Sequence, residues 1–115
     1  MSYQYKKIVP AERGTETIYE IVTAEDGLGF GFAEAEITRS ARHYHLKTSE
    51  TYVLISGRLK VWAGRNVYIL AKPGDAIEIP KGVTHWAENL DPKGSSRITV
   101  HSTPAWTSDD HHYDE

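Results

Sequence analysis

The sequence predicts a small all-β domain, either a sandwich or a small barrel. Its 115 residues are the length of one domain with its own core. Short segments rich in β-branched and aromatic residues recur along the chain, with Gly, Pro, Asn and Asp between them at regular spacing. No stretch has the periodicity of a long amphipathic helix.

The expected strands follow in order. We place them at residues 17–23, 28–38, 51–56, 57–63, 67–71, 76–79, a strand that opens at His85, and 97–102. In the second strand Ala33, Ala35 and Ile37 alternate with two glutamates. Turns are expected at 24–27, 63–66, 73–74, 80–82 and 91–96, where Gly, Pro, Asn and Asp gather.

Three histidines and a glutamate carry most of the chemical information. Because side chains at i and i+2 of a strand point to the same face, His43 and His45 should project together. Glu50 directly precedes the strand expected at 51–56, and His85 opens a later strand. If Glu50 faces inward, then Tyr52, Leu54 and Ser56 share its face. Imidazole and carboxylate are ordinary ligands of Zn, Fe, Mn, Ni and Cu.

The spacing of these residues resembles the two sequence motifs of the cupins, which are small metal-binding β-barrels. The first motif has the form G-x5-H-x-H-x(3–4)-E-x6-G, and its defined positions hold His43, His45, Glu50 and Gly57. Ile37 stands where that motif begins with Gly, a position that is not a ligand. The second motif, G-x5-P-x-G-x2-H-x3-N, is matched throughout, by Gly74, Pro80, Gly82, His85 and Asn89.

The resemblance implies a double-stranded β-helix, a jelly-roll-like barrel over residues 17–102. Residues 1–16 would form an N-terminal arm that supplies an edge strand or a dimer contact, and residues 103–115 an acidic tail. It also implies a homodimer, because many single-domain cupins pair through edge strands. The metal ligands that it implies are His43, His45, Glu50 and His85.

The ligand set predicts one divalent ion per chain and leaves its identity open among Fe, Mn, Ni and Zn. The chain has no cysteine, which excludes disulfides, zinc–thiolate sites and Cys-ligated iron–sulfur clusters. Octahedral coordination by four ligands would leave two positions for a substrate. Tetrahedral zinc would instead be closed and structural.

Four further residues are candidates for the site. Tyr52, two residues after Glu50, is a candidate catalytic acid or base, although a core aromatic is the more frequent role. Arg42 and Trp86 are candidates for substrate binding, Arg42 by pairing with a carboxylate. Asn89 is expected to lie in a turn or to orient the strand that carries His85.

The chain's charge is unevenly distributed. The formal net charge is −3, and four acids lie in residues 109–115 beside His111 and His112. We expect this end to be a flexible, solvated tail, with stray metal binding as the alternative, and His101 to lie outside the site. The remaining residues are close to neutral and form no basic stripe, so nucleic acid is not an expected partner.

The function that we predict is a metal-dependent enzyme that acts on a small polar molecule inside the barrel, of the dioxygenase, isomerase or epimerase, or lyase type. The alternative is a non-catalytic cupin that contains a metal and binds a small ligand such as a sugar. A storage or scaffold barrel is a third hypothesis, disfavoured by the chain's small size. No signal peptide or segment of transmembrane length is evident, so a cytoplasmic location is expected.

Overall fold

The computed structural model describes residues 5–10 and 13–114. Its strands are β1 (Lys7–Pro10), β2 (Gly14–Val22), β3 (Gly31–Ser40), β4 (His43–Tyr44), β5 (Ser49–Ser56), β6 (Leu59–Ala63), β7 (Asn66–Leu70), β8 (Ala76–Ile79), β9 (His85–Asn89), β10 (Ser96–Thr103) and β11 (His112–Tyr113). Two short 3-10 helices, η1 (Ala24–Asp26) and η2 (Ser108–Asp110), complete the secondary structure of the described residues.

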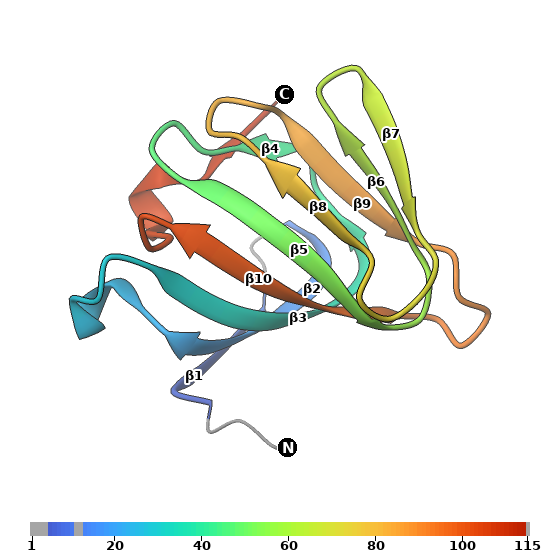
Figure 1. Ribbon diagram of the computed structural model, residues 1–115, viewed down its shortest axis with the longest axis horizontal. Helices are drawn as coiled ribbons and strands as arrows, with labels where there is room; N and C mark the ends of the chain where they lie inside the picture. The colour runs from blue at the N-terminus through green and yellow to red at the C-terminus, as the bar shows by residue number, and fades with distance from the viewer. Residues whose placement is uncertain (1–4, 11–12, 115) are drawn as a thin grey trace.

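The strands form an antiparallel β-sheet that folds over on itself into a nearly closed barrel (Figure 1). One wall has the order β1-β2-β3-β10-β5-β8, and the other has the order β7-β6-β9-β4-β11. Strand β3 joins the two walls, because it pairs with β2 and β10 along its length and with β9 at its end, where Arg39 faces Glu88. The all-β prediction is therefore confirmed.

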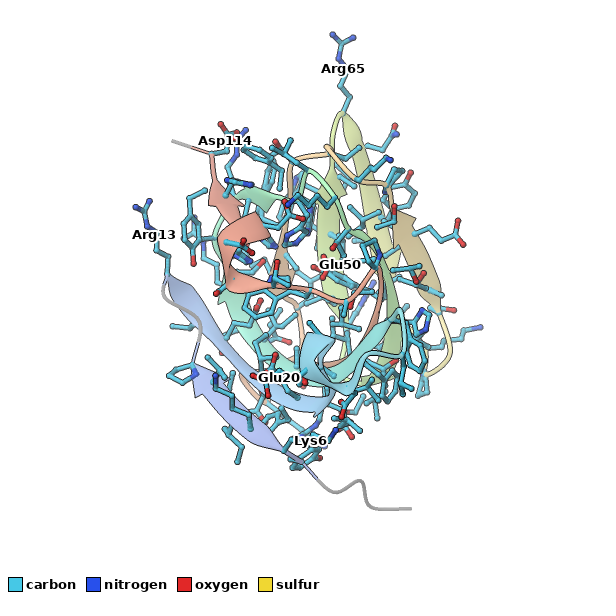
Figure 2. The ribbon with its side chains drawn as sticks, turned by 90° about the vertical axis from the view of Figure 1, so that its left-hand side faces the viewer. Lys6, Arg13, Glu20, Glu50, Arg65 and Asp114 are labelled. Atoms are coloured by element: carbon cyan, nitrogen blue, oxygen red, sulfur yellow. The ribbon has the colours of Figure 1, made fainter. Side chains whose placement is uncertain are left out.

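The apolar residues that alternate along the strands fill the space between the walls. The core comprises Ala35 and Ile37 of β3, Leu54 of β5 and Ile98 of β10, together with Tyr52, Leu59, Val61, Ala63, Leu70, Ile77, Ile79 and Ala87. Ile37, the residue at the departure from the first motif, lies within β3 and is buried. Figure 2 shows Glu50 between the walls and Arg65 at the outer tip of the β6–β7 hairpin.

The predicted alternation along β5 holds for Glu50, Tyr52 and Leu54, which are buried, and is wrong for Ser56, which is exposed. The pairing of β10 with β5 explains this difference. Arg97 pairs with Ser56 but the next residue, Ile98, pairs with Leu54, so Ile55 is the extra residue of a bulge. A bulge moves the residues beyond it to the other face of the sheet.

The first and last of the described strands, β1 and β11, are each paired with a neighbour. Strand β1 is an edge strand that pairs with β2. An edge strand is one of the two roles expected for the N-terminal arm, of which residues 1–4 and 11–12 lie outside the described residues. The flexible, solvated tail expected for residues 109–115 is wrong for residues 109–114, since β11 pairs with β4 and Asp110 is buried. Among the described residues, no helix is long and apolar enough to cross a membrane.

Candidate metal centre

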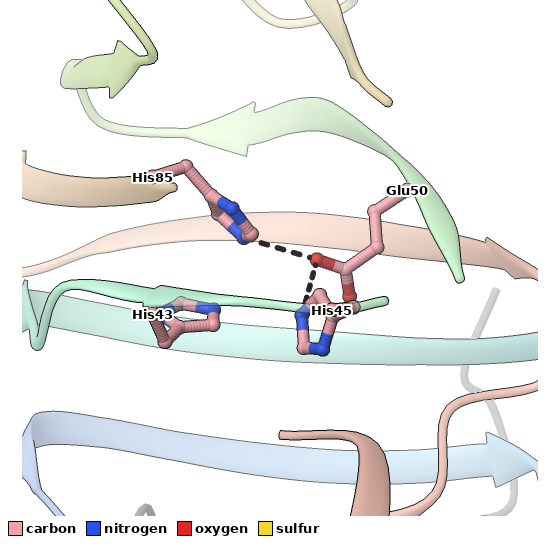
Figure 3. A group of neighbouring side chains, drawn as sticks. All are labelled: His43, His45, Glu50 and His85. Atoms are coloured by element: carbon pink, nitrogen blue, oxygen red, sulfur yellow. Dashed lines mark hydrogen bonds and ion pairs between the residues drawn. The ribbon is translucent and has the colours of Figure 1, made fainter. Parts of the chain in front are cut away.

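The structure brings together the four residues that spacing predicted as metal ligands. His43 lies on β4, His45 follows it, Glu50 lies on β5, and His85 opens β9 (Figure 3). Strands β4 and β9 are paired so that His43 is opposite His85. One potential ligand atom from each residue lies within 4.8 Å of the others, and no member of the group is more than 7% exposed.

Each histidine ring is oriented by a backbone carbonyl. The Nδ1 atom of His43 lies 2.7 Å from the oxygen of Ala41, and that of His85 lies 2.9 Å from the oxygen of Val83. His45 Nδ1 lies 2.9 Å from the oxygen of Asp110. Because a carbonyl oxygen can only accept, each Nδ1 carries a proton, and each ring turns its Nε2 toward the cluster. This is the arrangement that orients metal-ligating histidines in proteins.

One buried atom of this cluster is without a hydrogen-bond partner. His85 Nε2 lies 3.2 Å from Glu50 Oε1 in a hydrogen bond. His45 Nε2 lies 3.1 Å from the same oxygen but is not aligned for one. Within residues 5–10 and 13–114, it is the single buried side-chain nitrogen or oxygen without a hydrogen-bond partner. Such an atom costs about 1–3 kcal/mol, and a bound cation would satisfy it.

The charges of the cluster suit a divalent cation. Burial raises the pKa of Glu50, but the close contacts with His45 and His85 and the attraction of their charges lower it by more, so the carboxylate stays ionised. Burial and the neighbouring His85 lower the pKa of His43 to about 3. Burial also lowers the pKa of His45, yet the adjacent Glu50 carboxylate more than compensates and the net pKa is raised. A metal ion would take the place of the His45 proton, so the cluster could hold one.

A cavity of about 430 Å³ borders the cluster. His43, His45 and Glu50 line one side of it. Across from them the inward face of β2 presents alternating acidic and apolar side chains, Glu16, Ile18, Glu20 and Val22. Among the described residues that line the cavity there is no Lys or Arg.

Sequence reasoning missed Glu16 and Glu20 as cavity residues. Burial, and then repulsion by Glu50, raise the pKa of Glu16 to about 7. The signal was present in part, because Glu20 shares strand parity with Ile18 and Val22 within the strand predicted at 17–23. Glu16 lies one residue before that predicted strand, whereas β2 begins at Gly14.

The C-terminal segment, residues 103–114, forms another wall of the cavity through Trp106, Ser108, His111 and Tyr113. The ring of His111 stacks on that of His43, with centroids 4.5 Å apart and planes 10° apart. Trp106 Nε1 donates a hydrogen bond to His111 Nδ1 at 3.2 Å, so a neutral His111 carries its proton on Nε2. Burial and the nearby His45 lower the pKa of His111 to about 4, which keeps the ring neutral.

The other predicted site residues have different places. Tyr52 is buried and lines the cavity, with its ring 6.0 Å from that of His85. Arg42 and Trp86 do not line the cavity: Arg42 lies over the Trp86 ring and pairs with Asp114 at 2.9 Å. The predicted substrate contact by these two residues therefore has no support from this cavity.

Asn89 is a turn residue. Its side chain bonds to both the N–H and the carbonyl of Asp91 and accepts a hydrogen bond from Ser96, so it shapes the turn after β9. His101 is exposed, stacks on Phe30 and lies outside the site, as predicted.

Solved structures share this fold. A protein from Planctomyces limnophilus has a TM-score of 0.78 and 22% identity, with 98% of this chain and 94% of that chain covered. Pac13, a nucleoside dehydratase from Streptomyces, has a TM-score of 0.75 and 15% identity, covering 100% and 92%. Ectoine synthase from P. lautus has a TM-score of 0.72 and 16% identity, covering 93% and 80%.

Among curated proteins, none matches the sequence. The family model described as the cupin domain matches residues 34–101, which is more than half of the chain and includes all four residues of the cluster. With both motifs, the antiparallel barrel and the family match in agreement, this chain belongs to the cupin family.

Proposed function

We propose that this protein is a metal-dependent enzyme that acts on a small polar molecule in the barrel cavity, by chemistry of the lyase or isomerase type. One observation carries the proposal: the cavity that borders the His/Glu cluster is also lined by Glu16, Tyr52 and His111. One divalent ion, Fe, Mn, Ni or Zn, would polarise an oxygen atom of the substrate as a Lewis acid.

The chain's own residues would supply proton transfer and orientation. Glu16, with its pKa raised to about 7 by burial and by Glu50, can take up and return a proton near neutral pH. Burial, Glu50 and Glu16 raise the pKa of Tyr52 well above its usual value, so its hydroxyl remains a donor. The Nε2–H of His111 would donate a further hydrogen bond to a substrate oxygen.

The charge and size of the cavity support an uncharged or cationic substrate. Glu16 and Glu20 line it, and none of its described lining residues is a Lys or Arg that could pair with a phosphate or carboxylate. Its volume of about 430 Å³ lies within the range of small-molecule sites. Hydroxylated molecules such as sugars and nucleosides have the donors that carboxylates accept.

The name of one protein of similar fold agrees with this class of reaction. Pac13 is described as a nucleoside dehydratase, and structures of its variants contain uridine. Ectoine synthase also carries an enzyme name. At 15% and 16% identity these likenesses support the choice of compounds to test and no particular substrate.

The test is a screen of the full chain, stripped of metal and reloaded separately with Fe(II), Mn(II), Ni(II) or Zn(II). Each form is incubated with sugars, nucleosides, hydroxy acids and amines, and products are identified by mass spectrometry. We expect turnover of an uncharged or cationic compound, and a loss of about 100-fold or more in Glu16→Gln. Glu78→Gln, an exposed glutamate on β8, is the matched control and should keep full activity.

Two outcomes would count against the proposal, and two others would change the role of one residue in it. Iron that changes state in air while a substrate gains oxygen would indicate a dioxygenase. A compound that binds but is recovered unchanged with every metal would favour the non-catalytic alternative. Full activity in Glu16→Gln would remove that residue's role, and full activity in Tyr52→Phe would assign Tyr52 to the core alone.

A further inference from the structure

The C-terminal segment lies beyond the region matched by the family model, which ends at residue 101. It nevertheless reaches the metal centre. Strand β11 pairs with β4, the strand that carries His43, and Asp110 contacts the residues that follow β4. The orientation of the centre therefore depends in part on residues outside the family region.

His45 differs from the other two histidines in what holds its ring. His43 and His85 are each oriented by the carbonyl two residues before them, at Ala41 and Val83, so their support is local. The carbonyl that orients His45 belongs to Asp110, 65 positions later in the chain. The Nε2 atom of His45 is also fully buried and without a hydrogen-bond partner.

Asp110 is itself fixed to the same stretch of backbone. Its carboxylate accepts the N–H of Leu46 at 2.9 Å and that of Lys47 at 3.0 Å, and the residue is only 3% exposed. These two bonds and the bond from His45 to the Asp110 carbonyl connect one residue to three consecutive positions. They hold the carbonyl at a set distance from the imidazole.

We propose that Asp110 is a positioning residue for the metal centre: it holds His45 in the orientation and tautomer that present Nε2 to a metal ion. The inference rests on the metal site of the proposed function. It follows that metal binding and docking of the C-terminal segment stabilise each other, because a coupling between two events acts equally in both directions. The proposal concerns the binding of a divalent cation alone, so its test needs no substrate.

The test compares Zn²⁺ affinity in metal-stripped full-length variants, measured by competition with a chelator. We expect Asp110→Ala to weaken binding by about 10- to 100-fold, the usual effect of removing a group that orients a ligand. Asp110→Asn should lose less, because its single carboxamide oxygen can still accept one of the two N–H groups. Asp109→Ala, an exposed neighbour, is the matched control and should bind as the wild type does.

Two further readouts separate positioning from a general effect on folding. The Nδ1 proton of zinc-bound His45 should be visible by nitrogen-15 NMR in the wild type and in Asp109→Ala, and lost to exchange in Asp110→Ala. In the wild type, Zn²⁺ should increase the hydrogen-exchange protection of β11. This second readout applies even if Asp110→Ala fails to fold.

The results distinguish failure of the role of Asp110, failure of the coupling, and failure of the metal site itself. Wild-type zinc affinity and an intact His45 Nδ1 signal in Asp110→Ala would overturn the role of Asp110 and leave the metal site standing. Protection of β11 that does not change with Zn²⁺ would overturn the coupling. If the wild type binds no Zn²⁺, Mn²⁺, Ni²⁺ or Fe²⁺, the metal site of the proposed function fails first.

Discussion

At the scale of single residues, protons compete with a metal ion for the His/Glu cluster. Glu50 stays ionised because His45 and His85 keep the pKa of its carboxyl well below the usual value. His43 is neutral above its pKa of about 3, which burial and His85 have lowered. Glu50 raises the pKa of His45 by more than burial lowers it. The His45 ring must therefore lose a proton when a metal ion binds.

We therefore predict that metal affinity decreases as the pH falls through the raised pKa of His45. The decrease should be about tenfold per pH unit for each proton that the ion displaces, that of His45 among them. Calorimetric titration with Zn²⁺ between pH 6 and pH 8, in buffers of different ionisation enthalpy, counts that proton. Release of no proton would contradict the raised pKa of His45.

Residues whose role depends on local sequence could be predicted, and residues whose role depends on contacts with distant segments could not. The four ligands could be predicted because i, i+2 parity and motif spacing are local properties of the chain. Asp110 and His111 could not, because their roles arise when β11 pairs with β4. A run of acids is usually solvated, but here the N–H groups of Leu46 and Lys47 compensate the buried charge of Asp110.

At the scale of elements, Gly57 determines how β5 leads into β6. Its φ of +90° is in the left-handed region, and a Cβ there would lie 2.9 Å from Ser96 Cα and Cβ and closer still to Ser96 Oγ. Ser96 cannot move aside easily, since its hydroxyl accepts the N–H of Arg58 and donates to Asn89 Oδ1. The glycine of the first motif therefore has a steric function in this chain.

Gly57→Ala should be more destabilising than Gly74→Ala. Both positions have positive φ, but a Cβ at Gly74 would meet no atom within 4 Å, so its cost is backbone strain of about 1–2 kcal/mol. Overpacking against Ser96 should add about 1–3 kcal/mol at Gly57. Urea unfolding of the metal-free variants measures both losses. Equal losses would show that Ser96 yields to the added methyl group.

The strands also show where the prediction from the sequence failed and why. The segment 76–79 and the start of the strand at His85 were predicted correctly, because turn residues flank them. The bulge at Ile55 was not predicted, since it arises from pairing with β10, more than 40 positions away. Parity along β5 is correct up to that residue and reversed beyond it.

At the scale of the whole molecule, the homodimer implied by the family resemblance stays a prediction, and β7 is the edge that we propose for it. Among the described residues, β7 pairs with β6 alone. Val67, Tyr68 and Ile69 on this strand are all exposed, Val67 at 51%. An apolar edge strand with unpaired backbone groups favours pairing with a second copy.

Light scattering on the purified protein should therefore give the mass of two chains. Tyr68→Lys should shift that mass toward one chain, because a charge at the centre of β7 opposes edge pairing. Leu28→Lys changes a residue that is also exposed, at 61%, but lies away from β7, and should leave the dimer intact. A single-chain mass for the wild type at every concentration would contradict the prediction.

The claim on which the account depends is that His43, His45, Glu50 and His85 bind one divalent metal ion. The most direct measurement is the metal content of the untagged full-length protein by mass spectrometry, beside His45→Ala and the control His101→Ala. We expect about one ion per chain in the wild type and the control, and loss of most of it in a folded His45→Ala. An equal metal content in His45→Ala, or no metal in the wild type even after supplementation, would contradict the account.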